Sequence, residues 1–299
     1  MIDHLHIKNF MCFKELEIPT LKRVNLIAGK NNSGKTTLLD AIRILRSIKI
    51  FHPKGNHLVP AVINHILFTR KIFKKGSIYN YFKLSHYLGK NKGISINDNS
   101  IDEDDYDANI FIDPPIEKLI YVRFNADFDT LSSLWEEVAL TDYEEDVYKI
   151  LRETIQPDLV RINVGREVVN VRLKNMKNPV PLTTMGDGVN RILLIALSLI
   201  NANHSILLID ELELGLHYSA LEKLWNMIFK YAQKWNIQVF ATTHSQDVLR
   251  TFHYVSDDEK YIDDAQYIRL QINRKGENEA IIFDGERLRE TLDLQLEIR

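Results

Sequence analysis

A glycine-rich stretch near the N-terminus places the strongest constraint on how this chain folds. Its sequence is Gly29-Lys30-Asn31-Asn32-Ser33-Gly34-Lys35-Thr36, which has the spacing of a phosphate-binding loop. An apolar segment typical of a strand precedes it at residues 24–28, and a helical pattern follows at residues 37–42. A plain Gly/Asn turn would account for the glycines but not for lysine and threonine directly after the second one. The sequence therefore predicts a nucleotide-binding loop between a strand and a helix.

The chemistry of this loop assigns a role to its main residue types. The two glycines let the backbone curl so that its N–H groups point at phosphate oxygens, and the following helix presents its positive end. Lys35 adds a positive charge for the β- and γ-phosphates, and the hydroxyl of Thr36 is a ligand for Mg²⁺. The predicted nucleotide-binding residues of this region are Gly29, Asn31, Asn32, Ser33, Gly34, Lys35, Thr36 and Thr37.

Two carboxylates follow an apolar run at residues 206–209. Four consecutive apolar residues predict a strand that is buried on both faces, as in the centre of a parallel sheet. Asp210, at the carboxyl end of this strand, would hold the water shell of Mg²⁺, so the predicted metal ligands are Thr36 and Asp210. Glu211 would polarise the attacking water. An acidic pair can also be a solvated turn, but its coexistence with the phosphate loop argues against that interpretation.

A histidine follows a further predicted strand, at residues 237–243. His244 would lie at the carboxyl edge of the sheet, where it can contact the γ-phosphate or the attacking water. A lone histidine at such a position is more often structural. As the third element of this set we predict that it is catalytic, which gives Glu211 and His244 as the catalytic residues.

These motifs together resemble the ATP-binding-cassette (ABC) ATPases, in the branch that contains the SMC-type and OLD-type (overcoming lysogenization defect) ATPases. The resemblance covers about residues 1–46 and 180–252. Residues 5–16 resemble the N-terminal strand pair, residues 210–217 the Walker B motif running into the D-loop, and residues 243–245 the His switch. It implies an α/β fold: an ABC-type core with a mixed or parallel sheet, N-terminal antiparallel strands and an inserted segment. It also implies hydrolysis of ATP with Mg²⁺, and a homodimer, or a higher homo-oligomer, that sandwiches ATP.

The chain departs from the ABC pattern in two places. The signature, normally Leu-Ser-Gly-Gly, corresponds to residues 185–188, before a helical pattern at 190–197. Its role is to complete the phosphate pocket of the partner subunit, and we predict that backbone groups of Gly186 and Gly188 do so, with Thr183 or Thr184 supplying the hydroxyl. Secondly, residues 1–155 contain no glutamine. The glutamine that senses Mg²⁺ and water in the family is therefore replaced by another group.

Length and composition predict one sizeable domain. At 299 residues and 45% hydrophobic content, the chain can bury a large core, and we predict a single ABC-type domain over residues 1–299 with an insertion at about 49–118. A single cysteine, Cys12, excludes an intramolecular disulfide and favours the cytoplasm. No apolar run reaches the roughly 18–20 residues of a membrane span.

Other segments have readable local patterns. We expect a strand at 118–124, helices within 129–156, hairpins at 159–173 and 266–283, and a short helix at 285–294. Residues 1–100 carry 17 basic and 5 acidic residues, and much of the excess is interleaved with aromatic residues between 70 and 92. Such a segment can bind the phosphates of a nucleic acid and stack on its bases. It can also be a solvated face that neutralises the acidic residues after it, or a surface that binds an acidic protein.

Three function classes fit these features. The first is an ATP-hydrolysing switch or sensor of an OLD-like antiviral defence system, which controls a separate effector such as a TOPRIM or HNH nuclease or a toxin. The second is a repair or recombination ATPase that acts on DNA directly, and the third is a transporter subunit. The deviant signature counts against transport, and the lack of coiled-coil heptads counts against the large repair machines. We also expect no TOPRIM domain on this chain, because no paired acidic motif with its own core follows residue 252.

Overall fold

The structure is a computed structural model of the 299-residue chain. It describes residues 1–51, 94–96, 99–101, 119–123, 128–165, 167–186, 188–283 and 288. The basic and aromatic residues between 70 and 92 lie outside this part of the chain, as does the helix expected at 285–294, apart from Leu288.

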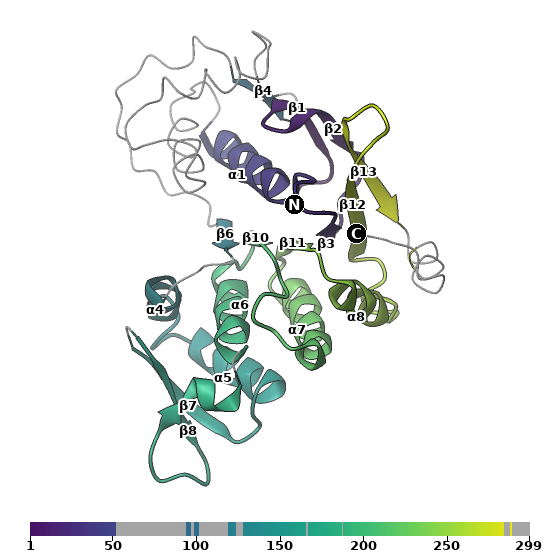
Figure 1. The fold of residues 1–299 in the computed structure, drawn as a ribbon. Helices are drawn as coiled ribbons and strands as arrows, with labels where there is room; N and C mark the ends of the chain where they lie inside the picture. The colour runs from purple at the N-terminus through teal and green to yellow at the C-terminus, as the bar shows by residue number, and fades with distance from the viewer. Residues whose placement is uncertain are drawn as a thin grey trace.

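A central mixed sheet organises the molecule (Figure 1). The strands, in spatial order, are β13 (Asn278–Phe283), β12 (Ala265–Ile272), β3 (Val24–Ala28), β11 (Gln238–Thr243), β10 (Ile206–Ile209) and β6 (Leu119–Val122). Every neighbouring pair from β12 to β6 is parallel, whereas β13 runs antiparallel to β12 and forms the predicted C-terminal hairpin with it. The α/β prediction with a mixed sheet is therefore confirmed.

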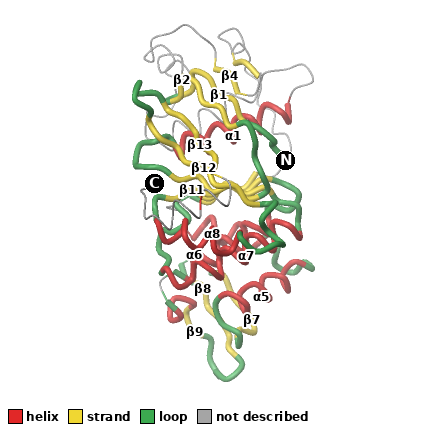
Figure 2. Tube along the Cα trace, turned by 90° about the vertical axis from the view of Figure 1, so that its right-hand side faces the viewer, coloured by secondary structure: helices red, strands yellow, loops and turns green. Residues whose placement is uncertain are grey.

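The side chains of each strand alternate between two hydrophobic clusters, one on each face of the sheet. On β10, Ile206 and Leu208 belong to the cluster around α1 (Lys35–Phe51), whereas Leu207 and Ile209 belong to the cluster on the opposite face. That second cluster includes residues of α6 (Val189–Asn201), α7 (Leu221–Lys234) and α8 (Gln246–Ser256). Figure 2 shows the sheet edge-on, with these three helices on one side of it and α1 on the other. Burial on both faces explains why β10 is an uninterrupted apolar run.

A second, antiparallel sheet covers α1. It contains β1 (Leu5–Phe10) and β2 (Phe13–Ile18), the predicted N-terminal strand pair, followed by β4 (Ile94–Ile96) and β5 (Asn99–Ile101) in the order β2-β1-β4-β5. Two short strands from the segment assigned to an insertion therefore join the N-terminal sheet. The start expected at about residue 49 falls inside α1, which continues to Phe51. The division into one domain with an insertion stays a prediction.

A smaller lobe lies beyond α6 and α7, on the side away from the sheet (Figure 1). It contains α4 (Phe128–Glu136) and α5 (Tyr143–Thr154), then the hairpin of β7 (Leu159–Val164) and β8 (Val169–Leu173), with β9 (Val180–Pro181) as the third strand. These elements confirm the helices and the hairpin expected from sequence. The chain returns to the core through the 3₁₀ turn η2 (Leu182–Met185). Within the described residues, no helix is both long and apolar enough to cross a bilayer.

Candidate ATP-binding and hydrolysis site

The phosphate loop connects β3 to α1, as its sequence context predicts. Its two glycines occupy positions that no other residue fits. A Cβ atom on Gly29 would lie 2.4 Å from the carbonyl oxygen of Leu270. Gly34 has φ +97°, a backbone conformation that disfavours any side chain, and a Cβ atom there would lie 2.6 Å from the ring of Phe13. The curl of the loop therefore depends on both glycines.

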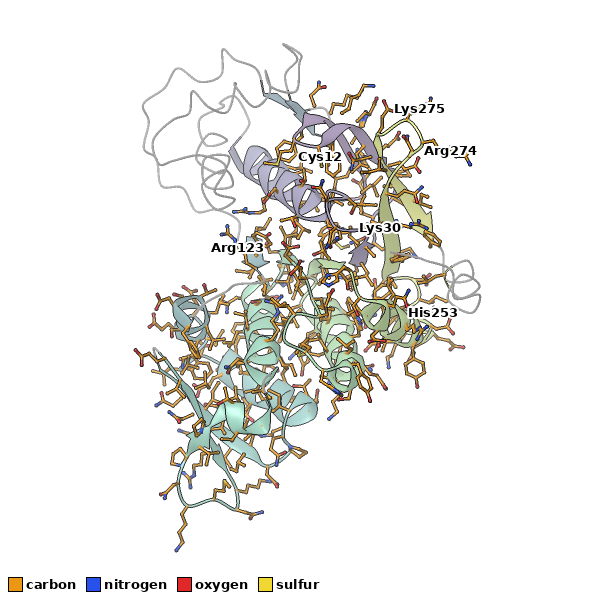
Figure 3. The ribbon with its side chains drawn as sticks, viewed as in Figure 1. Cys12, Lys30, Arg123, His253, Arg274 and Lys275 are labelled. Carbon is orange, nitrogen blue, oxygen red and sulfur yellow. The ribbon has the colours of Figure 1, made fainter. Side chains whose placement is uncertain are left out.

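Lys35 reaches back across this loop. Its Nζ atom donates to the carbonyl oxygens of Gly29, at 2.8 Å, and of Lys30, at 3.1 Å; Figure 3 labels Lys30. Burial lowers the pKa of Lys35, and the nearby carboxylates of Asp210 and Glu211 oppose this shift. A cation held in this way lies within the loop that would wrap the phosphates.

The remaining predicted loop residues divide by exposure. Asn31 and Asn32 are exposed, whereas Ser33 and Thr37 are buried. The Ser33 hydroxyl is a buried group with no hydrogen-bond partner within the described part of the chain, and such a group suits a polar ligand. The carbonyl oxygen of Ser33 accepts a hydrogen bond of 3.0 Å from the side-chain amide of Asn278, so β13 contacts and stabilises the loop.

Asp210 and Thr36, the predicted metal ligands, lie together. Asp210 continues the alternation of β10 beyond Leu208, so its side chain projects to the α1 face. Its Oδ1 atom accepts from the Thr242 hydroxyl at 2.6 Å and from the Thr36 hydroxyl at 3.4 Å. Hydroxyl and carboxylate oxygens suit Mg²⁺, which usually takes its other ligands from phosphates and water. Accordingly, the described residues contain no group of three or more acidic, histidine or cysteine side chains that could hold a metal by themselves.

Glu211 lies at a sharp change in chain direction. Its φ of +50° is in the left-handed region, which non-glycine residues rarely adopt and which costs about 1–3 kcal/mol. The Glu211 N–H donates to the Thr242 hydroxyl at 2.9 Å, which holds this conformation. The turn directs the chain away from the strand after Asp210, so Glu211 does not continue the alternation of β10.

Arg191 stabilises this turn from the other face of the sheet, a role that the sequence analysis missed. The side chain is buried on α6, and its guanidinium donates to the carbonyl oxygens of Asp210 at 2.8 Å, Glu211 at 3.2 Å and Arg123 at 2.7 Å. The sequence did contain a signal for this role: Arg191 is the one charged residue in the apolar segment 189–201, and a buried arginine requires polar partners. Which carbonyls it meets is decided by helix packing.

His244 has a carboxylate partner that was also missed. The Nδ1 atom of His244 lies 3.0 Å from Oε1 of Glu213, which also accepts the His244 backbone N–H at 2.9 Å. The other oxygen of Glu213 accepts from the Thr243 hydroxyl at 2.8 Å. The histidine side chain is half-exposed, whereas Glu213 is mostly buried. The structure therefore pairs His244 with Glu213.

The two glycines of the predicted signature have different surroundings. Gly186 has φ +121°, and a Cβ atom there would meet nothing within 4 Å. Gly188 precedes α6, and a Cβ atom on it would lie 2.6 Å from the Gly215 carbonyl oxygen and 2.9 Å from Leu216. The hydroxyl of Thr184 donates to the Pro181 carbonyl oxygen at 2.7 Å. Gly188 therefore packs against residues 215–216, which follow the acidic pair in the same chain, whereas Gly186 faces open space.

A strand–loop–helix phosphate loop with an aspartate on a central parallel strand defines a P-loop ATPase of the α/β class. The chain belongs to the AAA ATPase domain family, whose profile matches residues 1–161. A second profile, described as "AAA domain, putative AbiEii toxin, Type IV TA system", matches residues 102–250. The protein is accordingly an ATP-hydrolysing enzyme.

Curated relatives share different parts of the chain. An uncharacterised protein of Methanocaldococcus jannaschii is 38% identical over 82 residues, which are 27% of this chain and 36% of that protein. A Helicobacter pylori protein named ATP/GTP phosphatase is 23% identical, across 96% of this chain and 99% of the relative. The DNA replication and repair protein RecF of Nitrosococcus oceani is 48% identical over 44 residues, 15% of this chain and 12% of its own length. The chain thus spans about a third of the first relative and almost all of the second.

Solved structures of SMC heads have the same fold. The SMC head domain of Thermotoga maritima matches with a TM-score of 0.52 and 14% identity, over 94% of this chain and 98% of that one. An SMC head bound to the C-winged helix domain of ScpA matches with a TM-score of 0.54 and 13% identity, over 97% and 99%. The expected ABC-type core is therefore present as an SMC-head-like fold.

The pairing of Glu213 with His244 can be tested by Glu213→Gln. The substitution removes a charged acceptor worth about 1.5–3 kcal/mol, so we expect ATP turnover to fall roughly tenfold or more. Nucleotide affinity should change little, because the partners of Glu213 are Thr243 and His244. Steady-state ATPase assays and fluorescent-nucleotide titration measure the two effects. Glu222→Gln, at an exposed site on α7, is the matched control. Turnover within twofold of the wild type would show that His244 acts without Glu213.

Proposed function

We propose that the protein is an ATP-driven molecular switch with the following catalytic arrangement. Lys35 and the loop N–H groups would bind the β- and γ-phosphates, and Thr36 and Asp210 would hold Mg²⁺. The ion, when bound, would neutralise charge on the transferred phosphate. Glu211 would take a proton from the attacking water, and His244 would contact the γ-phosphate or that water. The observation that carries this proposal is the 3.4 Å contact between the hydroxyl of Thr36 and Asp210.

Preorganisation of the backbone supports these roles. Four hydrogen bonds hold the turn at Asp210 and Glu211. The Arg191 guanidinium donates to the carbonyl oxygens of both residues. The Thr242 hydroxyl donates to the Asp210 carboxylate and accepts the Glu211 N–H. A carboxylate that is fixed before the reaction need not reorganise during it, and this favours hydrolysis. The membership of the AAA ATPase domain family supports the same chemistry.

We propose further that two copies sandwich two ATP molecules head to tail. The predicted signature segment includes Gly186, which faces open space shortly before the N-terminus of α6. The positive end of a helix is suited to the γ-phosphate of a facing subunit. Gly188 packs on Gly215 and Leu216, and two residues close to these in sequence, Leu214 and Tyr218, have exposed fractions of 40% and 66%. Apolar groups of this kind favour burial against a second protein surface.

We propose that this cycle serves a system in the cytoplasm whose damaging activity resides in another protein. A switch that exists as an ATP-bound and an ATP-free form can hold an effector and release it on a trigger. The leading candidates are a TOPRIM or HNH nuclease or a toxin of an OLD-like defence system. Similarity to a family described as part of a Type IV TA system supports a toxin–antitoxin context for the ATPase.

A repair or recombination ATPase that acts on DNA is the second candidate. It is favoured by the 44-residue similarity to RecF and by the shared fold with SMC heads. The two candidates differ in what stimulates turnover: DNA itself in the second, and a protein partner in the first.

The catalytic assignment predicts opposite behaviour for two variants. Lys35→Ala should abolish ATP binding, because it removes the cation that offsets the phosphate charge. Glu211→Gln should keep binding and lower turnover by about 10²–10⁴-fold, the usual contribution of a general base. Titration of a fluorescent ATP analogue and phosphate release measure these effects. Equal hydrolysis by the wild type and Glu211→Gln would contradict the assignment of the base.

The sandwich predicts a nucleotide-dependent dimer. Glu211→Gln should trap it, so light scattering with ATP and Mg²⁺ should give roughly twice the chain mass of 34.9 kDa. Without ATP, or with Lys35→Ala added to the same protein, the monomer mass should return. A monomer at high protein concentration with ATP and Mg²⁺ would argue against the homodimer.

The effector assignment predicts that this chain alone has no nuclease activity and that it binds a separate effector protein. The purified protein should cleave neither DNA nor RNA, and it should bind the product of a neighbouring gene in a manner that changes with ATP. Pull-downs and nuclease assays, with and without ATP, measure both properties. Metal-dependent cleavage by this chain alone that survives Lys35→Ala would refute the assignment. DNA-stimulated ATP turnover without a protein partner would favour the repair function.

A further inference from the structure

Tyr121 lies beside the proposed metal site on the neighbouring strand. β6 pairs in parallel with β10, and Tyr121 is in register with Leu208. The Tyr121 side chain therefore projects to the same face as Leu208 and, two residues further on, Asp210. Its hydroxyl donates to Oδ2 of Asp210 at 3.3 Å. Tyrosine is the third hydroxyl-bearing residue around this carboxylate, after Thr36 and Thr242.

The ring of Tyr121 is held by two arginines. The guanidinium carbon of Arg43 lies 4.9 Å from the ring centroid and that of Arg123 lies 5.3 Å from it, both within the range of cation–π attraction. Arg43 is itself anchored to the buried Asp40 at 3.1 Å, one turn earlier on α1. Arg123 directly follows β6 and is labelled at that edge of the sheet in Figure 3. The two contacts restrict the ring and hence the direction of the hydroxyl.

The two oxygens of Asp210 are thereby held by different hydroxyl groups. Thr242 donates to Oδ1 and Tyr121 donates to Oδ2. A carboxylate held at both oxygens cannot rotate freely, so its remaining lone pairs keep one direction. Hydrogen bonds of this kind orient metal ligands, and their loss typically weakens metal affinity by about 10–100-fold.

We propose that Tyr121 is a positioning residue for the metal site, and that its hydroxyl fixes the Asp210 carboxylate for the hydrated Mg²⁺ ion of bound ATP. This inference rests on the proposed function, because the metal-holding role of Asp210 belongs to that proposal. The hydroxyl of Tyr121 is also a polar group at a site for which residues 1–155 supply no glutamine. A phenol is protonated at neutral pH, so it donates without titrating.

The test is Tyr121→Phe in the full chain, with a fluorescent non-hydrolysable ATP analogue as the probe. Phenylalanine keeps the ring that the two arginines contact and removes only the hydroxyl. We expect the Mg²⁺ concentration for half-maximal analogue binding to rise about tenfold, the low end of the range for such partners. Binding of the analogue in EDTA and the thermal unfolding midpoint should stay near wild type. Tyr231→Phe is the matched control, because its buried hydroxyl has no partner among the described residues and it lies on α7.

Asp210→Asn, measured in parallel, separates this inference from the proposed function. An unchanged Mg²⁺ titration for Asp210→Asn would overturn the metal role of Asp210, and the inference with it. A raised Mg²⁺ requirement for Asp210→Asn together with a wild-type titration for Tyr121→Phe would overturn the role of Tyr121 alone. Equal weakening of analogue binding in Mg²⁺ and in EDTA for Tyr121→Phe would also overturn it, since a positioning role acts through the ion.

Discussion

The burial of one carboxylate, that of Asp210, imposes requirements on much of the surrounding structure. An ionised group that is 4% exposed costs several kcal/mol unless hydrogen bonds compensate for the water it has lost. Three hydroxyl groups meet this requirement, from α1, β11 and β6, and the Asp210 N–H donates to the Val122 carbonyl oxygen at 2.9 Å. Elements far apart in sequence are therefore held at the end of β10, on the face where α1 begins with the phosphate loop.

A second set of contacts extends from this point to the proposed subunit surface. Arg191 ties α6 to the backbone of residues 210–211, and Gly188 at the start of α6 packs on residues 215–216. Glu213, between these two contact points, holds His244. The signature segment, the acidic pair and the histidine are thus parts of one packed unit. In the proposed switch, a change at the phosphates would reach the exposed segment at Gly186 through these contacts, because packed groups do not move independently.

Local patterns were enough to place most of the elements. The apolar run 206–209, the alternation at 159–173 and the spacing of residues 29–36 predicted their strands and loop because each reflects a local periodicity or turn requirement. The proximity of Thr36 to Asp210 was also predictable, since parallel strands bring their carboxyl ends to the same edge of a sheet. Glu213, Arg191 and Tyr121 were missed, because nothing in their immediate sequence says which polar group they meet. Two strands at 94–101 that join the N-terminal sheet were missed for a similar reason: sheet pairing is a long-range property.

The amino-acid sequence by itself determined that this chain is a P-loop ATPase with an α/β core, because phosphate binding demands particular residues at particular spacings along the backbone. It also predicted the residues at the two ends of the proposed site, in the loop and at the acidic pair. Only the tertiary structure decided how those ends are held: which carboxylate orients His244, which arginine fixes the turn after β10, and which phenol reaches Asp210. These partners come from helices and strands that packing and sheet register bring together, and hydrogen bonds of about 3 Å depend on that register rather than on separation in sequence.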